Sequence, residues 1–359
     1  MTIETANRVQ VAAGHWKPRF VANGIDVNDF DRVLAATTEW RDWAPNWKRI
    51  GDEHRAIGDE AERSGHVVTA TEAHQRAAWC YHLGKFLWFE DRRLHDELRE
   101  LTVATYAKAM PHLDPPGRRI EAPFEGAVIP GILRTPRGTS KRAPLAILVP
   151  GLDSVKEELH AMENDFLRRG VATLTIDGPG QGENAPRFPI RADWSTVITP
   201  LLDHLASADL GLDLDRVGLM GISMGGIYGP RAAAKEKRLR ALVALAGPYD
   251  LSECWPQLNP LTKGGYVFYT QSRDEAEAFE RSKALTLRGL LKDVTCPLLV
   301  IHGGKDRLFP PEQAERIVRE APNATLLLYP EGNHVCNNIP YKYRPAMADW
   351  MAARLGAAR

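Results

Sequence analysis

The chain has 359 residues, more than one ordinary domain needs, and its composition is that of a soluble globular protein. Hydrophobic residues make up 44% and charged residues 26% of the sequence, which excludes a disordered or collagen-like chain. Basic and acidic side chains each number 46, so the formal net charge is zero and no nucleic-acid partner is expected. No run of about 18 apolar residues occurs, so we also expect no membrane span.

From Asn28 to Met110 the sequence follows a helical pattern with few strand signals. Asn28 is expected to cap a first helix that Pro45 interrupts, and Thr69 begins a capping box for a later helix. Six of the nine tryptophans lie in this part, and aromatic residues at helical spacing are more often core than cofactor site. We therefore predict an all-helical N-terminal domain over residues 1–115.

After Pro115-Pro116-Gly117 the sequence alternates between short apolar strands and helices, as in a mostly parallel, doubly wound α/β sheet. The expected strands cover residues 119–123, 127–134, 145–150, 172–177, 217–221, 241–246, 298–302 and 325–329. Residues 251–291 exceed the length of a simple crossover and are expected to add helices over the strand ends, where such sheets bind ligands. We predict one α/β domain over residues 116–359.

The strongest chemical signal is the hexapeptide Gly221-Ile222-Ser223-Met224-Gly225-Gly226, which follows an expected strand and precedes an expected helix. A serine flanked by glycines at such a junction sits on a tight turn that exposes its hydroxyl. The strand–turn–helix context distinguishes this match from a chance turn. We therefore predict Ser223 as a catalytic nucleophile.

A serine nucleophile needs a base and an acid that orients the base. His334 follows the last expected strand, and Asp306 lies just past the carboxyl end of the strand before it. We therefore predict that Ser223, His334 and Asp306 form a catalytic triad. Asp250, after an earlier strand, is the reserve candidate for the acid. His302 lies inside a strand and is expected to be a packed core residue.

Attack on a carbonyl also needs hydrogen-bond donors for the oxygen that becomes negative. A buried strand ends at Pro150-Gly151, so the backbone N–H groups of Leu152 and Met224 are expected to form this oxyanion hole. Asp153 then lies at the mouth of the expected pocket. Its spacing alone slightly favours a different interpretation, a solvated acid just before a helix start.

Other motifs indicate no cofactor. The stretch Gly178-Pro179-Gly180-Gln181-Gly182 lacks the Gly-x-Gly-x-x-Gly pattern of a dinucleotide site, and Gly303-Gly304-Lys305 lacks the remaining residues of a phosphate loop. No pair of histidines or cysteines has metal-ligand spacing. The four cysteines lie far apart, as expected of reduced thiols, and the N-terminus lacks the order of a signal peptide. We therefore expect a cytoplasmic location.

Four stretches give the chain a resemblance to the α/β-hydrolase superfamily over about residues 119–359. They are Pro150–Glu158, Asp177–Glu183, Gly221–Gly226 and Gly332–Asn338. More narrowly, the chain resembles the branch of 2,6-dihydroxypseudooxynicotine hydrolase, the fungal Yg1-type polyketide-shortening hydrolases and the fermentation–respiration-switch esterases. The helical N-terminus also matches that branch, so the resemblance covers most of the chain.

The resemblance implies an α/β-hydrolase fold whose N-terminal helices form a cap, help to close the pocket and contribute to a homodimer. It also implies cleavage of a C–C bond next to a ketone, as in the best-described members. An acidic residue of the oxyanion loop takes part at the active site of the nicotine-pathway member. Asp153 matches that place, with aspartate where glutamate is expected, so a chemical and a structural role both stay open. Glu253 is a further substrate-binding candidate on similarity alone.

The leading hypothesis is a serine hydrolase that cleaves a C–C bond in a β-diketone or aryl ketone. The alternative is an ester or lactone hydrolase with the same triad and an easier leaving group. Sequence does not separate these two, since both reactions need identical protein groups. A ligand-binding pseudo-enzyme belongs to a different class, and the intact triad disfavours it.

Overall fold

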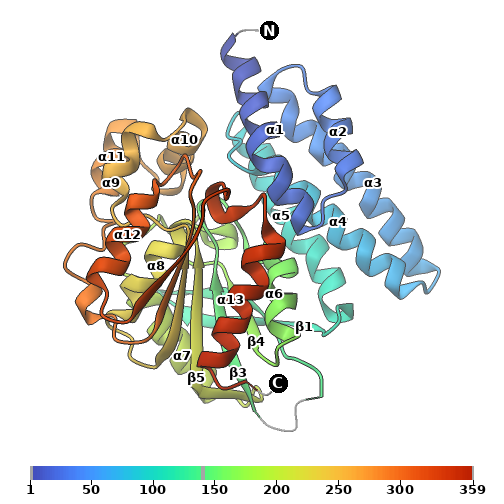
Figure 1. Ribbon diagram of the computed structural model, residues 1–359. Helices are drawn as coiled ribbons and strands as arrows, with labels where there is room; N and C mark the ends of the chain where they lie inside the picture. The colour runs from blue at the N-terminus through green and yellow to red at the C-terminus, as the bar shows by residue number, and fades with distance from the viewer. Residues whose placement is uncertain (1–2, 139–141, 358–359) are drawn as a thin grey trace. The chain divides into compact units, whose positions relative to one another are not determined.

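The computed structural model describes residues 3–138 and 142–357, and the chain divides into two compact units, Met1–Arg118 and Arg119–Arg359 (Figure 1). Met1 and Thr2, the first residues of the N-terminus for which no signal peptide is expected, lie outside the described residues. The boundary between the units falls inside the first strand, β1 (Gly117–Phe124). Among the described residues, no helix is both long enough and apolar enough to cross a membrane.

The described part of the first unit contains helices and no complete strand. Its α-helices are α1 (Ile3–Asn23), α2 (Val27–Ala36), α3 (Trp43–Arg63), α4 (Val67–Lys85) and α5 (Arg92–Ala109). The indole rings of Trp40 and Trp43 are stacked with centroids 5.5 Å apart, and the ring of Trp47 meets that of Trp43 at 5.9 Å. All three side chains are buried. The prediction that the tryptophans are core residues is therefore confirmed for this cluster.

The helix starts of this unit differ from prediction. Asp26, rather than Asn28, caps α2, because its carboxylate accepts a hydrogen bond of 2.8 Å from the N–H of Asn28. Pro45 lies in the first turn of α3 and does not interrupt it, since a proline there loses no intrahelical hydrogen bond. Helix α4 begins at Val67 without a side-chain cap, ahead of the predicted capping box at Thr69. Helix α1 was not among the predicted helices.

The described residues of the second unit form a sheet of eight strands, and every predicted strand is present. After β1 come β2 (Ala127–Arg134), β3 (Ala143–Val149), β4 (Ala172–Ile176), β5 (Leu212–Ile222), β6 (Leu239–Leu245), β7 (Leu298–Gly303) and β8 (Ala324–Tyr329). The spatial order is β1-β2-β4-β3-β5-β6-β7-β8, with β2 antiparallel to β4 and parallel pairing from β4 through β8. The predicted, mostly parallel sheet is confirmed.

Helices cover both faces of this sheet, because successive strand residues point to opposite sides. In β3, Leu145 and Ile147 belong to one apolar cluster, while Ala146 and Leu148 belong to the other. The first cluster includes residues of α7 (Ser195–Ser207), α8 (Met224–Ala233) and α12 (Pro311–Glu320). The second includes residues of α6 (His160–Leu167) and α13 (Pro340–Arg354), which lie together on one side of the sheet in Figure 1.

Three α-helices lie between β6 and β7, inside the predicted insertion of residues 251–291. They are α9 (Leu251–Cys254), α10 (Pro260–Tyr269) and α11 (Glu275–Ser282). Since neighbouring parallel strands end at the same edge of a sheet, the loops after β3, β5, β7 and β8 meet at one edge. All the predicted catalytic residues lie in those loops.

Candidate active site

Ser223 lies on the turn between β5 and α8 with a φ of +55°, in the left-handed region that residues other than glycine rarely adopt. The flanking glycines make this turn possible. A Cβ on Gly221 would lie 1.9 Å from the carbonyl oxygen of Gly225, and a Cβ on Gly225 would lie 2.2 Å from that of Val149. The turn places the serine hydroxyl at the carboxyl end of β5.

His334 links the serine to a carboxylate. Its Nε2 atom lies 2.9 Å from Oγ of Ser223, and its Nδ1 atom lies 2.7 Å from Oδ2 of Asp306. The imidazole and the carboxylate are both buried, and the ring of Phe309 meets the imidazole edge-on with centroids 5.3 Å apart. The structure thus brings the three predicted residues together in the geometry that a general base needs.

Asp306 is held by backbone as well as by the histidine. Its Oδ1 accepts hydrogen bonds from the N–H groups of Leu308 at 2.8 Å and Phe309 at 3.0 Å. Burial acts to raise the pKa of Asp306, but the charge and hydrogen bond of His334 outweigh it, and the pKa lies below its usual value. His302 is fully buried in β7, with Nε2 2.8 Å from the carbonyl oxygen of Phe309, and has the packed position predicted for it.

Two other acidic residues lie apart from the triad. Asp250 caps α9, where its carboxylate accepts a hydrogen bond of 3.0 Å from the N–H of Ser252. Glu253 lies in α9, and its carboxylate forms ion pairs with Arg288 at 2.7 Å and with Arg316. Among the hydrogen bonds and ion pairs of the described residues, none joins either carboxylate to a residue of the triad. The substrate-binding role expected for Glu253 therefore gains no support from its contacts, because arginines engage both of its oxygens.

The loop after β3 passes directly against the nucleophile. A Cβ on Gly151 would lie 3.0 Å from Cβ and 3.5 Å from Oγ of Ser223. Such a close approach leaves little room for a side chain at this position. It brings the backbone before Leu152 next to Ser223, while Met224 directly follows the serine at the start of α8. The loop that carries Leu152 and the helix start that carries Met224 thus both lie beside Ser223, and the role of their N–H groups as oxyanion donors stays a prediction.

Asp153 is buried, and not solvated as its spacing slightly favoured. Its residue is 1% exposed and has a φ of +57°. The hydroxyl of Tyr269, at the end of α10, donates a hydrogen bond to its carboxylate. One turn earlier, the hydroxyl of Tyr266 lies 2.7 Å from Sδ of Met224. Sequence reasoning missed both tyrosines, and the only signal for them was the predicted insertion over the strand ends.

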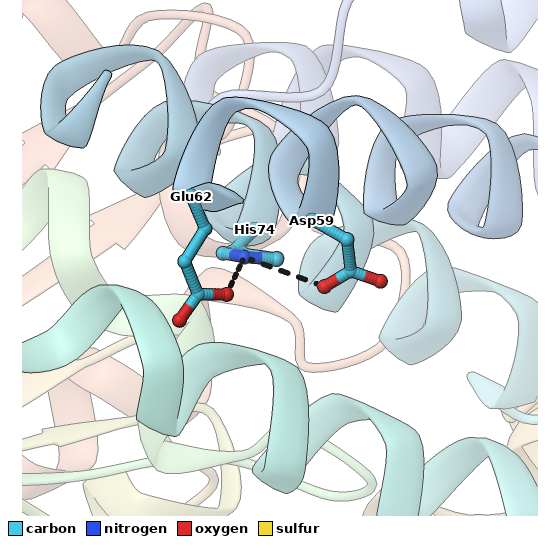
Figure 2. Close-up of side chains that lie close together, drawn as sticks. All are labelled: Asp59, Glu62 and His74. Atoms are coloured by element: carbon cyan, nitrogen blue, oxygen red, sulfur yellow. Dashed lines mark ion pairs between the residues drawn. The ribbon is translucent and has the colours of Figure 1, made fainter. Parts of the chain in front are cut away.

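A separate group of titratable side chains lies in the helical unit (Figure 2). Nε2 of His74 lies 3.8 Å from a carboxylate oxygen of Asp59 and 3.5 Å from one of Glu62. The ammonium group of Lys108 donates to the same two oxygens at 2.7 and 3.0 Å. Burial lowers the pKa of His74, and the Lys108 charge acts in the same direction. Lys108 of α5 thus pairs with both carboxylates of α3, and His74 of α4 lies beside the same two oxygens.

Comparison with known families gives two overlapping matches. The model described as "Esterase FrsA-like" matches residues 26–254, and the model of the prolyl oligopeptidase family matches residues 162–358. Each match covers more than half of the chain. The first begins in the helical unit and continues through Ser223, and the second contains the whole triad.

Individual relatives agree with these matches. The 2,6-dihydropseudooxynicotine hydrolase of Paenarthrobacter nicotinovorans is 33% identical over 341 residues, which are 93% of this chain and 90% of the relative. Hydrolyase poxO of Penicillium oxalicum is 35% identical over 223 residues, 58% of this chain and 52% of the relative. The chain thus spans about half the length of this fungal relative.

Solved structures extend the likeness to the fold. The crystal structure of 2,6-dihydroxy-pseudo-oxynicotine hydrolase superposes with a TM-score of 0.87 at 31% identity, covering 94% of this chain and 95% of the other. AbyA5 superposes with a TM-score of 0.75 at 22% identity, covering 92% and 90%, which shows likeness of fold alone. The resemblance predicted from the sequence is confirmed: this chain belongs to the α/β-hydrolase superfamily, in the branch of 2,6-dihydropseudooxynicotine hydrolase and the FrsA-like esterases, and it is a hydrolase.

Proposed function

We propose that this hydrolase uses Ser223, His334 and Asp306 to cleave a C–C bond next to a ketone, in a β-diketone or an aryl ketone. One observation carries the proposal. The relative that matches 93% of the chain is named for a pseudooxynicotine, which is a ketone on a pyridine ring. The likeness extends through both units of the chain, so it includes more than the catalytic residues that every serine hydrolase of this fold needs.

The reaction begins with attack of the Ser223 hydroxyl on the ketone carbon. Nε2 of His334, 2.9 Å away, takes the serine proton, and the ionised Asp306 stabilises the resulting imidazolium through Nδ1. The ketone oxygen becomes negative and accepts hydrogen bonds from the backbone N–H groups of Leu152 and Met224. These are the same steps with which a serine esterase begins.

Collapse of the tetrahedral intermediate distinguishes the proposed reaction. The C–C bond breaks, its electron pair remains on the departing carbon, and the acyl group stays on Oγ of Ser223. A carbanion is a far poorer leaving group than an alkoxide, so the substrate must delocalise the charge over a second carbonyl or a hydroxylated ring. The carbon takes the proton of the His334 imidazolium, either directly or relayed by the Asp153 carboxylate, so that His334 is neutral again before the next step. Tyr269 positions Asp153 through the hydrogen bond to its carboxylate.

Water completes the cycle. His334 removes a proton from a water molecule, which attacks the acyl-serine and releases a carboxylic acid. One water is consumed, its oxygen enters the acid, and the departing carbon gains a hydrogen. The products are thus one carboxylic acid and one ketone or arene, with no change of oxidation state that needs a cofactor.

An ester or lactone hydrolase is the second candidate, and the match to an FrsA-like esterase model favours it. The same triad and oxyanion donors perform that reaction, and no proton donor for carbon is needed. The buried Asp153 in the oxyanion loop favours C–C cleavage, because a carbanion leaving group needs help with proton transfer and an alkoxide needs little.

A matched substrate panel tests the proposal. Benzoylacetone, an ortho-hydroxylated aryl ketone, p-nitrophenyl acetate and a γ-lactone are each incubated with the wild type and with Ser223→Ala, and the acids released are quantified. Release of benzoic or acetic acid from benzoylacetone by the wild type alone supports the proposal. Fast turnover of the ester or lactone without cleavage of either ketone would assign the chain to the esterases.

We also infer that the protein is a homodimer in the cytoplasm and that the helical unit carries the contact between the subunits. Val67 and Val68, at the start of α4, are 49% and 72% exposed, and Ile57 of α3 is 50% exposed. Apolar side chains in such positions suit a subunit interface. The wild type is expected to elute as a dimer in size exclusion with light scattering, and Val68→Glu is expected to shift it toward the monomer. A monomeric wild type would contradict the inference.

A further inference from the structure

The stretch Gly178-Pro179-Gly180-Gln181 forms a tight turn directly after β4. The N–H of Gln181 donates to the carbonyl oxygen of Gly178 at 3.0 Å, and Gly180 has a φ of +76°. Proline followed by a residue with positive φ at the two central positions is the pattern of a type II turn. A Cβ on Gly178 would lie 2.3 Å from the ring of Trp194, so this position also requires glycine.

The turn directs the Gln181 side chain back toward the loop after β3. Gln181 is 2% exposed, and its Oε1 accepts a hydrogen bond of 3.0 Å from the N–H of Gly178. That bond fixes the orientation of the amide, with Oε1 toward its own turn. Nε2 therefore points the other way and donates to the carbonyl oxygens of Pro150, at 2.6 Å, and of Gly151, at 3.4 Å.

These two carbonyls belong to the peptide groups that lead into the oxyanion hole. The C=O of Gly151 and the N–H of Leu152 are parts of one planar trans peptide, so they point in opposite directions. A donor that holds the carbonyl on one side thereby aims the N–H toward the other side. The same loop lies against Ser223, as the 3.5 Å approach of a Gly151 Cβ to Oγ indicates.

A second tie holds the far end of this loop. The backbone N–H and the ammonium group of Lys156 each donate to Asp177 at 2.9 Å, and the ammonium also pairs with Glu183 at 2.5 Å. Lys156 and Asp177 are almost fully buried. This tie fixes the course of the loop, whereas Gln181 bonds to the peptide that carries the N–H of Leu152.

We propose that Gln181 is a positioning residue for catalysis: its amide holds the Gly151–Leu152 peptide so that the Leu152 N–H faces the developing oxyanion. The proposal rests on the proposed function of Ser223 as the nucleophile. It requires Gln181 to act on the transition state, in which the oxygen is charged, and to leave binding of the neutral ketone or ester nearly unchanged.

Two variants test this role. Gln181→Met keeps the length of the side chain and removes both donors, and Gln181→Glu keeps the shape but sets an acceptor against the two carbonyls. Gln313→Met is the matched control. Gln313, in α12, is also buried and bonds to backbone, accepting from the N–H groups of Tyr249 and Asp250 at 2.9 and 3.0 Å beside the start of α9.

Hydrolysis of p-nitrophenyl acetate and cleavage of benzoylacetone are measured for all three variants, with the melting temperature of each. Removing a whole oxyanion donor costs about 10² to 10³ in kcat, so misplacing one is expected to cost about 10- to 100-fold in both Gln181 variants. KM is expected to stay within about threefold. The affinity of a trifluoromethyl ketone, which forms an anionic adduct with the serine, is expected to fall in proportion to kcat/KM. Gln313→Met is expected to keep both constants near those of the wild type.

The outcomes separate this role from the function on which it rests. Unchanged kcat in a folded Gln181→Met or Gln181→Glu, or an equal loss in Gln313→Met, would overturn the positioning role while turnover that depends on Ser223 persists. A change in KM that accounts for the whole loss would also overturn it, since that is the signature of a general structural defect. Absence of any Ser223-dependent turnover in the wild type would overturn both proposals together.

Discussion

Nε2 of His334 lies 2.9 Å from Oγ of Ser223, although 111 positions separate the two residues in the chain. This contact depends on two backbone features, the positive φ of Ser223 and the loop after β8 that carries the histidine. Because the imidazole and the hydroxyl act as a unit, loss of either group is expected to remove the same step.

Ser223→Ala is therefore expected to lower kcat by about 10³-fold or more, with His334→Ala close to it and the double variant little worse than either. The substitution removes only a hydroxyl group, so the melting temperature should change little. Steady-state kinetics and labelling with a fluorophosphonate check both points. Retained labelling in Ser223→Ala would place the nucleophile elsewhere.

The acid of the triad is tested by a pair of matched substitutions. Asp306→Asn is expected to lower kcat by about 10³-fold or more, because an amide no longer orients and stabilises the imidazolium. Asp250→Asn is expected to leave kcat within about twofold and to change stability by less than about 0.5 kcal/mol, since asparagine also caps helices well. Kinetics and urea unfolding of both variants measure this. The reverse order of losses would move the role of the acid to Asp250.

Much of this site is predictable from the sequence because its parts are local. Gly221 and Gly225 mark the turn around the serine, and the chain order of strands brings Asp306 and His334 to the same sheet edge. Strands β3, β6 and β7 also have continuous apolar runs, so their places are visible without tertiary information. The close contacts of both glycines with neighbouring backbone explain why the motif takes this form.

Other features depend on contacts between distant segments and leave no local signal. Gln181 bonds to carbonyls 30 and 31 positions away, and Tyr269 bonds to Asp153 across 116 positions. The interpretation of Asp153 as a solvated acid, which its spacing slightly favoured, was wrong because Tyr269 of α10 supplies a buried hydrogen-bond donor for its carboxylate. Glu253 was chosen by similarity, and only the positions of the two arginines in space reveal its ion pairs.

A buried carboxyl group away from the site predicts a dependence of stability on pH. Glu163 of α6 accepts a hydrogen bond of 2.9 Å from Thr173 and lies 3.6 Å from Arg134. Burial raises the pKa of Glu163 from 4.5 to about 7, despite the opposing charge of Arg134. Between these two values the unfolded chain releases a proton that the folded chain keeps, so stability is lost as pH rises.

Urea unfolding of the wild type and of Glu163→Gln from pH 4 to 8 isolates this effect. The free energy of unfolding of the wild type is expected to fall relative to the variant between about pH 4.5 and 7. The slope should be at most about 1.4 kcal/mol per pH unit, and it should level off above that range. A difference between the two proteins that stays constant with pH would show that Glu163 titrates alike in the folded and unfolded chains.

Asp153 separates the two candidate reactions through the leaving group. Asp153→Asn is expected to impair cleavage of benzoylacetone at least tenfold more than hydrolysis of p-nitrophenyl acetate, because only the carbanion needs a proton donor. Tyr269→Phe is the companion variant, since it keeps the carboxylate and removes the hydrogen bond to it. Equal impairment of both substrates by Asp153→Asn would give this residue a structural role.

Isotope transfer from water tests the central claim most directly. The wild type is incubated with benzoylacetone in ¹⁸O-enriched water, and the products are identified by mass spectrometry, with Ser223→Ala as the control. Hydrolysis through an acyl-serine predicts a carboxylic acid that carries one ¹⁸O atom from the water, together with the matching ketone, and neither product with the variant. Recovery of intact benzoylacetone from an enzyme that rapidly hydrolyses simple esters or lactones would contradict C–C bond cleavage.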